Sequence, residues 1–397
     1  MHDQFDKAVV QDTASVKWGT DREKGGHQGC IPMWIADMDF AVAPEITSAL
    51  QQRAALPIYG YTQVTDGYRE SIVGWMKQQH SADIDVDWIV PVPGVVPAID
   101  AAILTLTRPG DHILLHTPVY FPFYSSIQNN GRHVLPSSLI VKEGRVEIDF
   151  DDFETKLKRA RAFILCNPHN PTGKVYTKTE LEKIAALCRE NDVAIVADEI
   201  HHDLLYSETE FTTLFNIPAV DRSKMVFASA PSKTFNIAGL AASHFIIPDP
   251  KLRQEIQKTQ GRIGTTSLNL FAVVGSEAAY RYGKEWNRQS MAYIERNRDQ
   301  AVAYIRNEMP QIQVIPPEGT YFLWLDCRDI GLPMNQVDSF FMEKANVRFS
   351  PGPPFGKEGE GFVRMNIACT NHTLHQALGQ MRAALQDQAD KTIQGWR

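Results

Sequence analysis

Two features are missing from the sequence: a long apolar run and an excess of positive charge. No apolar stretch within the 397 residues approaches the length that a bilayer-spanning helix requires. The formal net charge is −7, and no local basic stripe offsets it. We therefore expect neither a membrane nor a nucleic acid as a partner. The 43% hydrophobic and 22% charged residues are typical of a globular protein.

Cysteine is scarce and scattered, and no CxxC pair occurs. The five cysteines are Cys30, Cys166, Cys188, Cys327 and Cys369. This spacing suggests neither a disulfide framework nor a zinc site, so buried free thiols are expected. Residues 1–26 are polar and mixed in charge, without the apolar core of a signal peptide. Together these features predict a cytoplasmic protein.

The chain is longer than one hydrophobic core usually supports, so we expect two domains. Residues 51–287 are predicted to form a large domain and residues 288–397 a smaller C-terminal domain. Residues 1–50 are predicted to form an N-terminal arm that shares the core of the small domain. No repeat or flexible linker interrupts this division.

Short apolar segments alternate with helical segments in the predicted large domain. Strands are expected at residues 112–115, 162–166, 193–197 and 225–228, and helices at residues 43–55, 67–80, 98–106, 179–190 and within a long region at 275–308. Thr179 is the predicted cap of the helix at 179–190. The alternation predicts an α/β fold with a mostly parallel, doubly wound sheet covered on both faces. Short strands near 314–325, 347–350 and 361–367, with a helix at 372–389, predict a smaller α+β domain.

Polar residues follow the ends of several predicted strands. Tyr120, Asn170, Asp198 and Lys233 each occur just after an apolar segment, and ligands bind outside the carboxyl ends of such strands. A lysine in a confined, partly desolvated turn can act as a Schiff-base nucleophile because it loses its proton more readily than in water. Taken alone, Lys233 could be an ordinary solvated surface lysine, as most lysines are, and Asp198 with Lys233 could form an ion pair.

A flat cofactor between Lys233 and Asp198 would account for both residues. Pyridoxal 5'-phosphate (PLP) requires a lysine for its aldehyde, a carboxylate for its ring nitrogen and a helix N-terminus for its phosphate. Gly94 leads directly into an apolar helix, whose first amides are available to an anion. Further ring contacts are expected from Asn170, His201 and Tyr120.

Three motifs resemble the motif series of the fold-type I PLP enzymes, the aminotransferase class I/II superfamily. They are NPHNPTG at 167–173, ADEIH at 197–201 and SKTFN at 232–236. Four further segments resemble the MalY/PatB-type cystathionine β-lyase (C–S lyase) branch: PMWIADMDF at 32–40, YGYT at 59–62, HHD at 201–203 and NIAGL at 236–240. The resemblance follows nearly the whole chain in order. It implies a PLP-dependent transferase fold, PLP as cofactor, and a homodimer with shared active sites.

The resemblance also implies roles for individual residues. Lys233 would bind the cofactor covalently and then act as the general base, with Tyr120 as the second catalytic residue. The implied cofactor ligands are Gly94, Val95, Val96, Tyr120, Asn170, Asp198, His201, Ser229, Ser232, Lys233 and Tyr61 from the neighbouring subunit. The implied substrate ligands are Arg364, as a clamp for the α-carboxylate, with Asn170, Ala36 and Asp37. Several relatives place a phosphate-binding arginine where Ala241 and Ala242 stand here.

The implied reaction is α,β-elimination of a cystathionine- or cysteine-type amino acid to a thiol, pyruvate and ammonia. Two alternatives stay open: an aminotransferase, which shares the early steps and the site residues, and a non-catalytic regulatory module on the same scaffold. A metal site built from Asp198, His201, His202 and Asp203 is disfavoured because neighbouring helical side chains diverge, so no metal is expected. The sequence does not fix which thio-amino acid is preferred.

Overall fold

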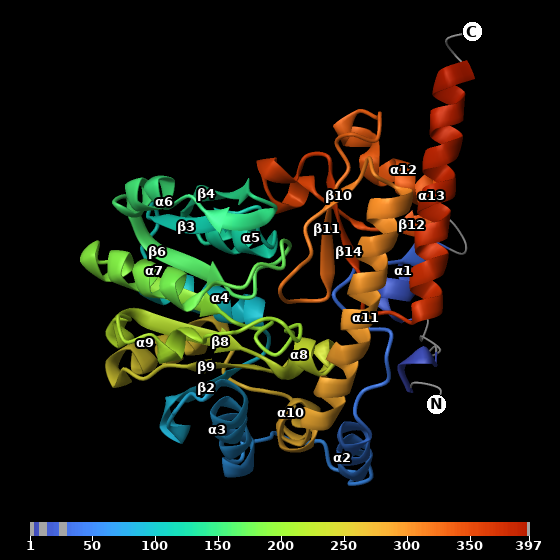
Figure 1. Ribbon diagram of the computed structural model, residues 1–397. Coiled ribbons are helices and arrows are strands. Elements are labelled where there is room, and N and C mark those ends of the chain that lie inside the picture. The colour runs from blue at the N-terminus through green and yellow to red at the C-terminus, as the bar shows by residue number, and fades with distance from the viewer. Residues whose placement is uncertain (1–3, 8–13, 24–29, 395–397) are drawn as a thin grey trace.

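The computed structural model describes residues 4–7, 14–23 and 30–394. Parts of the predicted polar N-terminal segment, residues 1–3, 8–13 and 24–29, lie outside the described residues. An eight-stranded sheet forms the large domain and a four-stranded sheet the small one, and the small domain lies beside the large sheet (Figure 1). The fold is therefore the predicted α/β large domain with a smaller α+β domain.

The large sheet is mixed but mainly parallel. Its strands, in spatial order, are β2 (Ile89–Val92), β9 (Ser243–Ile246), β8 (Met225–Ser229), β7 (Ala194–Asp198), β6 (Ala160–Cys166), β3 (His112–Thr117), β4 (His133–Lys142) and β5 (Arg145–Ile148). The five neighbouring strands from β8 to β4 pair in parallel. Strand β9 pairs antiparallel with both β8 and β2, and β5 pairs antiparallel with β4. The parallel strands therefore end at one edge, as predicted from their apolar sequences.

Helices cover both faces of this sheet because successive strand side chains point to opposite sides. In β6, Ile164 packs on one face and Phe163 on the other. The first face is covered by α4 (Val95–Leu106), α5 (Pro122–Asn129) and α9 (Pro250–Ile263). The second core contains α3 (Asp66–His80), α6 (Phe150–Leu157), α7 (Lys178–Glu190) and α10 (Leu270–Tyr282), and α2 (Pro44–Ala54) packs on α10.

The small domain combines C-terminal elements with the N-terminal arm. Its antiparallel sheet contains β10 (Gln313–Val314), β11 (Phe322–Asp326), β14 (Phe362–Asn366) and β13 (Ser350–Pro351), with helices α11 (Lys284–Glu308), α12 (Val337–Lys344) and α13 (Asn371–Gln394). Strand β1 (Ile31–Pro32) pairs parallel with β12 (Val347–Arg348), and helix α1 (Val16–Glu23) is bound to the arm by Lys17, whose Nζ donates to Asp39 Oδ1. The arm thus pairs with a strand of the small domain. The proposed domain boundary at 287/288 falls inside α11.

Two predicted helix boundaries were wrong. Thr177, not Thr179, caps α7: its hydroxyl accepts from the Glu180 amide and the Glu180 carboxylate accepts from the Thr177 amide, a capping box. The helical region at 275–308 is two helices, because the chain breaks at Gly283. A Cβ on Gly283 would lie 2.4 Å from a ring carbon of Phe235, so glycine allows this close approach.

Within the part of the chain that the structure describes, no helix has both the length and the apolar character required to span a bilayer.

Candidate active site

The loops that follow the parallel strands converge on one cavity. Its lining includes Tyr120 after β3, Asn170 after β6, Asp198 at the end of β7, and Lys233 after β8. The other lining residues are Ala36, Gly94, Val95, Val96, Phe123, Cys166, Ile200, His201, Ser232, Ala238, Ala241 and Ala242. The predicted convergence of four separate loops is therefore present.

Lys233 projects from a short helix, α8 (Pro231–Thr234). Its Nζ donates to the Ala36 carbonyl at 2.8 Å, and burial lowers its pKa, opposed by the Asp37 charge. Among the described residues, Lys233 and Asp198 form no ion pair with each other. The ion-pair interpretation of these two residues is therefore wrong, and an amine of lowered pKa lines the cavity.

Asp198 is a buried carboxylate at the end of β7, and it accepts only from the Ile200 amide at 3.1 Å among the contacts described. Burial raises its pKa to about 7, opposed by the Ile200 hydrogen bond and the His202 charge. A carboxylate that lacks a cationic partner is costly to keep ionised. A protonated ring nitrogen would supply that partner.

One end of the cavity is built for an anion. Gly94 has φ +103° and precedes α4, which has no side-chain cap, so the amides of Val95 and Val96 are available there. Ser232 lines the same cavity. The Ser229 side chain does not reach it, since its hydroxyl lies 3.5 Å from His202 Nε2. The cavity lining thus contains Ser232 but not Ser229.

Arg364 is a buried cation without an acidic partner. It lies on β14, where its Nη1 donates to Asn170 Oδ1 at 2.8 Å and its Nη2 to the Trp34 carbonyl and Ser350 Oγ, both at 3.1 Å. Its Nε is buried with no partner, and no carboxylate of the described chain lies within ion-pair distance. Burial lowers its pKa to about 10, opposed by nearby tyrosines. A buried guanidinium without an acid beside it favours the binding of an anionic ligand.

The residues predicted to contact the PLP ring, Asn170, His201 and Tyr120, are mainly neutral. Arginine only donates, so Asn170 turns its carbonyl oxygen to Arg364 and leaves its NH₂ group for an acceptor. His201 has a buried Nδ1 without a partner, and burial with the Lys233 and Arg364 charges holds its pKa well below the usual value. Burial also raises the pKa of Tyr120. These groups can hydrogen-bond or stack on a ring without adding charge.

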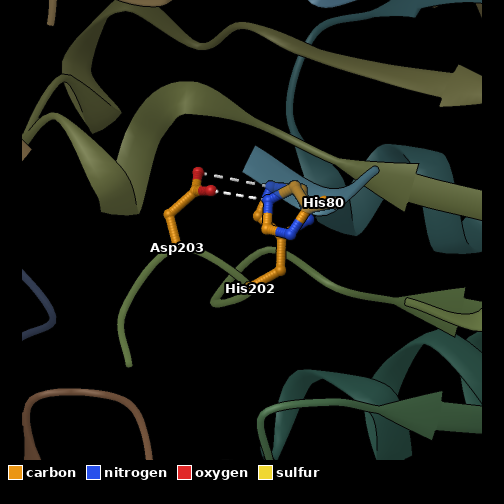
Figure 2. Close-up of side chains that lie close together, drawn as sticks. All are labelled: His80, His202 and Asp203. Carbon is orange, nitrogen blue, oxygen red and sulfur yellow. Dashed lines mark hydrogen bonds and ion pairs between the residues drawn. The ribbon is translucent and has the colours of Figure 1, made fainter. Parts of the chain in front are cut away.

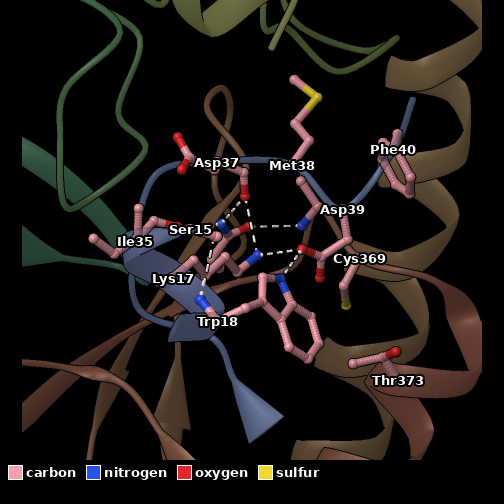
Figure 3. A network of polar contacts seen from close by, with 12 residues as sticks. Ser15, Lys17, Trp18, Ile35, Asp37, Met38, Asp39, Phe40, Cys369 and Thr373 are labelled. Atoms are coloured by element: carbon pink, nitrogen blue, oxygen red, sulfur yellow. Dashed lines mark hydrogen bonds and ion pairs between the residues drawn. The ribbon is translucent and has the colours of Figure 1, made fainter. Parts of the chain in front are cut away.

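The N-terminal arm reaches the cavity through Ala36, whose carbonyl also accepts from Tyr321 Oη at 2.9 Å. Asp37 does not line the cavity in this structure, and Figure 3 shows its carboxylate pointing away from the Lys17–Asp39 pair. Lys17 Nζ donates to the Asp37 carbonyl at 3.0 Å and to Asp39 Oδ1 at 2.9 Å. Helix α1 therefore holds the segment that presents Ala36.

Sequence reasoning missed Tyr321, Lys17 and the specific role of Asn236. The Asn236 side chain accepts from the Met38 amide at 2.9 Å and donates to the carbonyls of Met38 and Phe40 at 3.0 Å each. Its φ of +56° is a conformation that asparagine tolerates. The SKTFN motif contained this residue, but no local pattern indicated that its partner is the arm.

The four residues of the disfavoured metal site, Asp198, His201, His202 and Asp203, lie in two different places. Asp198 and His201 line the cavity. His202 and Asp203 instead form a separate buried cluster with His80, shown in Figure 2. These four residues therefore do not converge on one position.

The charges of the cavity complement PLP and an amino acid. An amine of lowered pKa suits an aldehyde, an unpaired carboxylate suits a pyridinium, and free helix amides suit a phosphate. The unpaired guanidinium suits a substrate carboxylate. Fold and cavity thus define the class of PLP-dependent enzymes that act on amino acids.

The chain belongs to the aminotransferase class I and II family, whose model matches residues 29–381. It is 40% identical over 384 residues to the cystathionine β-lyase PatB of Bacillus subtilis (strain 168), covering 96% of this chain and 99% of that protein. The predicted superfamily and branch are therefore confirmed.

Solved structures extend this likeness to the fold. Cystalysin from Treponema denticola, which contains pyridoxal 5'-phosphate, matches with a TM-score of 0.92 and 32% identity, over 98% of this chain and 100% of that one. A PLP-bound C–S lyase from Staphylococcus hominis matches with a TM-score of 0.88 and 30% identity, over 96% and 98%. The predicted PLP-transferase fold is confirmed.

Proposed function

We propose that this protein is a PLP-dependent C–S β-lyase that acts on cystathionine- or cysteine-type amino acids. The observation that carries the proposal is the buried guanidinium of Arg364, which has no acidic partner in the described chain and donates to Asn170, a residue that lines the same cavity as Lys233. Named cystathionine β-lyase and C–S lyase relatives across the full length support the enzyme class and the cofactor.

Different residues of the chain perform the separate steps of the elimination. When bound, PLP supplies an electron sink for the charge left at the α-carbon. Arg364 binds the α-carboxylate through paired N–H groups. Lys233 Nζ removes the α-proton, which its lowered pKa favours, and the Ala36 carbonyl accepts a hydrogen bond from the ammonium that forms. A thiolate then leaves the β-carbon.

The competing reaction is transamination. It uses the same anchor, base and carboxylate clamp, so the site residues do not separate the two reactions, and the named lyase relatives favour elimination. A non-catalytic regulatory role is disfavoured because Lys233, Asp198 and Asn170 line one cavity and Arg364 donates to Asn170.

The purified enzyme should produce pyruvate from cystathionine without any added keto acid. Elimination needs no amino-group acceptor, whereas transamination stops after one half-reaction without one. A panel of cystathionine, cysteine and related thio-amino acids, scored for pyruvate and thiol, measures this and ranks the substrates. Activity that depends strictly on an added keto acid would contradict the lyase proposal.

We also propose that the protein is a homodimer in which Tyr61 contacts the phosphate bound by the partner. The segment after α2 leaves apolar and aromatic side chains exposed: Leu56 at 60%, Ile58 at 76%, Tyr59 at 62% and Tyr61 at 111%. A second copy would bury this patch. Tyr61 does not line the cavity of its own chain, so a role there requires a partner.

Tyr61→Phe is expected to leave the dimer intact and weaken cofactor binding. A hydrogen bond to a charged group contributes about 1.5–3 kcal/mol, so PLP should bind roughly tenfold or more weakly. Tyr59→Phe is the matched control, because that hydroxyl donates to the Ala54 carbonyl within its own chain. Light scattering reports the dimer and absorbance titration the affinity. Equal PLP affinity in the two variants would remove Tyr61 from the phosphate site.

A cytoplasmic location is also proposed. Cys166, Cys188, Cys327 and Cys369 are buried free thiols. Unpaired thiols are typical of a reducing compartment. Fractionation of cells that express the protein would test this location.

A further inference from the structure

Asp203 is a buried carboxylate just outside the cavity. Its side chain is 2% exposed, and four donors from three segments surround it. They are Trp75 Nε1 at 3.1 Å from both oxygens, His80 Nε2 at 2.8 Å, His202 Nε2 at 3.3 Å and Thr234 Oγ1 at 2.8 Å. Figure 2 shows both imidazoles turned toward this one carboxylate.

The cluster is arranged for charge pairing rather than for a metal ion. A carboxylate offers about four lone-pair positions, and the indole, hydroxyl and two imidazole donors already occupy them. Both Nε2 atoms lie within reach of the Asp203 oxygens, and in this arrangement each donates to the carboxylate. The two imidazole rings also lie 4.3 Å apart, centroid to centroid.

One of the four donors is the immediate neighbour of Lys233. Helix α8 comprises only Pro231–Thr234, so few helical hydrogen bonds hold it. Its C-terminal end is fixed by Thr234 Oγ1 on Asp203, and the following turn is fixed by Asn236 on the N-terminal arm. Asp203 therefore fixes the backbone next to Lys233 through its hydrogen bond with Thr234.

A second connection leads to Asp198. Burial lowers the pKa of His202, but Asp203 outweighs this effect and the net pKa is raised. The His202 charge in turn opposes the burial that raises the pKa of Asp198. The other titratable groups facing His202 are His80 from α3, Glu199 beside Asp198, and His244 from β9.

We propose that Asp203 is a positioning residue of the active site, which fixes Lys233 through the hydroxyl of Thr234 and holds the His202 imidazole in place. The inference rests on the proposed anchor and base role of Lys233. It assigns a function to His202 and Asp203, the second and third residues of the HHD segment. Asp203 touches neither the cavity nor a substrate and acts only through its neighbours.

Thr234→Val tests this with little change in volume. The holoenzyme is expected to lose on the order of tenfold to a hundredfold in kcat, since small misplacements of a reacting group have effects of this size, while KM changes little. The pH midpoint of the visible cofactor band should also shift. Thr234→Ser keeps the hydroxyl and should retain most of both properties.

Thr259→Val is the matched control. Thr259 is a buried threonine of α9 whose hydroxyl accepts from Thr105 Oγ1 at 2.8 Å, and it does not line the cavity. This variant should show unchanged kcat and an unchanged cofactor band. Each valine variant loses one hydroxyl hydrogen bond: a buried one to a carboxylate at Thr234 and a part-buried one to a hydroxyl at Thr259. Thermal unfolding of both variants therefore reports the loss of stability separately from the loss of kcat.

Two results would overturn the inference. One is that Thr234→Val matches Thr259→Val in both kcat and cofactor band; the other is that Thr234→Ser loses as much as Thr234→Val. If Thr234→Val is not recovered folded, Thr234→Ala replaces it under the same criteria. The wild-type spectrum separates the two proposals, because a wild-type protein without a cofactor band would refute the proposed function itself.

Discussion

Lys233→Ala is expected to lose the visible absorbance of the cofactor–lysine bond together with nearly all turnover. Lys233 provides the one side-chain amine among the described residues that line the cavity. General-base catalysis alone contributes up to about 10⁴-fold, and the anchor is lost as well, so kcat should fall by at least about 10³-fold. Absorbance spectra and pyruvate formation from cystathionine measure the two effects.

Lys174→Ala is the matched control for this lysine. Lys174 is also mostly buried, but its Nζ pairs with Glu180 Oε1 at 2.9 Å outside the cavity. Its removal should lower stability and leave the cofactor band in place. Lyase activity near the wild-type level in Lys233→Ala would refute the anchor and base assignment, whatever the control shows.

Features that depend on local sequence were predictable. Apolar runs that end in polar residues defined the strand ends, and the rule that ligands bind beyond the carboxyl ends of parallel strands placed Tyr120, Asn170, Asp198 and Lys233 together. The glycine before α4 indicated the anion-binding end. The doubly wound sheet followed from the same alternation of short strands and helices.

Features that depend on side-chain direction or on distant partners were not predictable. Ser229 ends β8 on the side of the strand that faces His202, and a one-residue difference in strand register reverses that direction. Asp203 gathers Trp75, His80 and Thr234 from elements far apart in sequence, so no spacing pattern marks the cluster. Tyr61 points to solvent in a single chain, and its proposed role depends on a second copy.

Arg364→Lys is expected to raise KM for the amino-acid substrate strongly, with a smaller effect on kcat. Lysine keeps the positive charge but loses the planar fork that binds a carboxylate with two parallel hydrogen bonds. One lost charge-assisted bond contributes about 1.5–3 kcal/mol, so kcat/KM should fall roughly tenfold to a hundredfold. Steady-state kinetics with cystathionine, at saturating PLP, separate KM from kcat.

Arg298→Lys is the matched control, because Arg298 is a buried arginine that has acidic partners, whereas Arg364 has none in the described chain. Arg298 is also mostly buried, and its guanidinium lies 4.0 Å from the Tyr206 ring centroid, much as that of Arg364 lies 4.1 Å from the Phe322 centroid. Arg298, however, already pairs with Glu208 and Asp299. Its replacement should reduce thermal stability without changing KM. If Arg364→Lys also left KM unchanged, Arg364 would not be the residue that binds the substrate carboxylate.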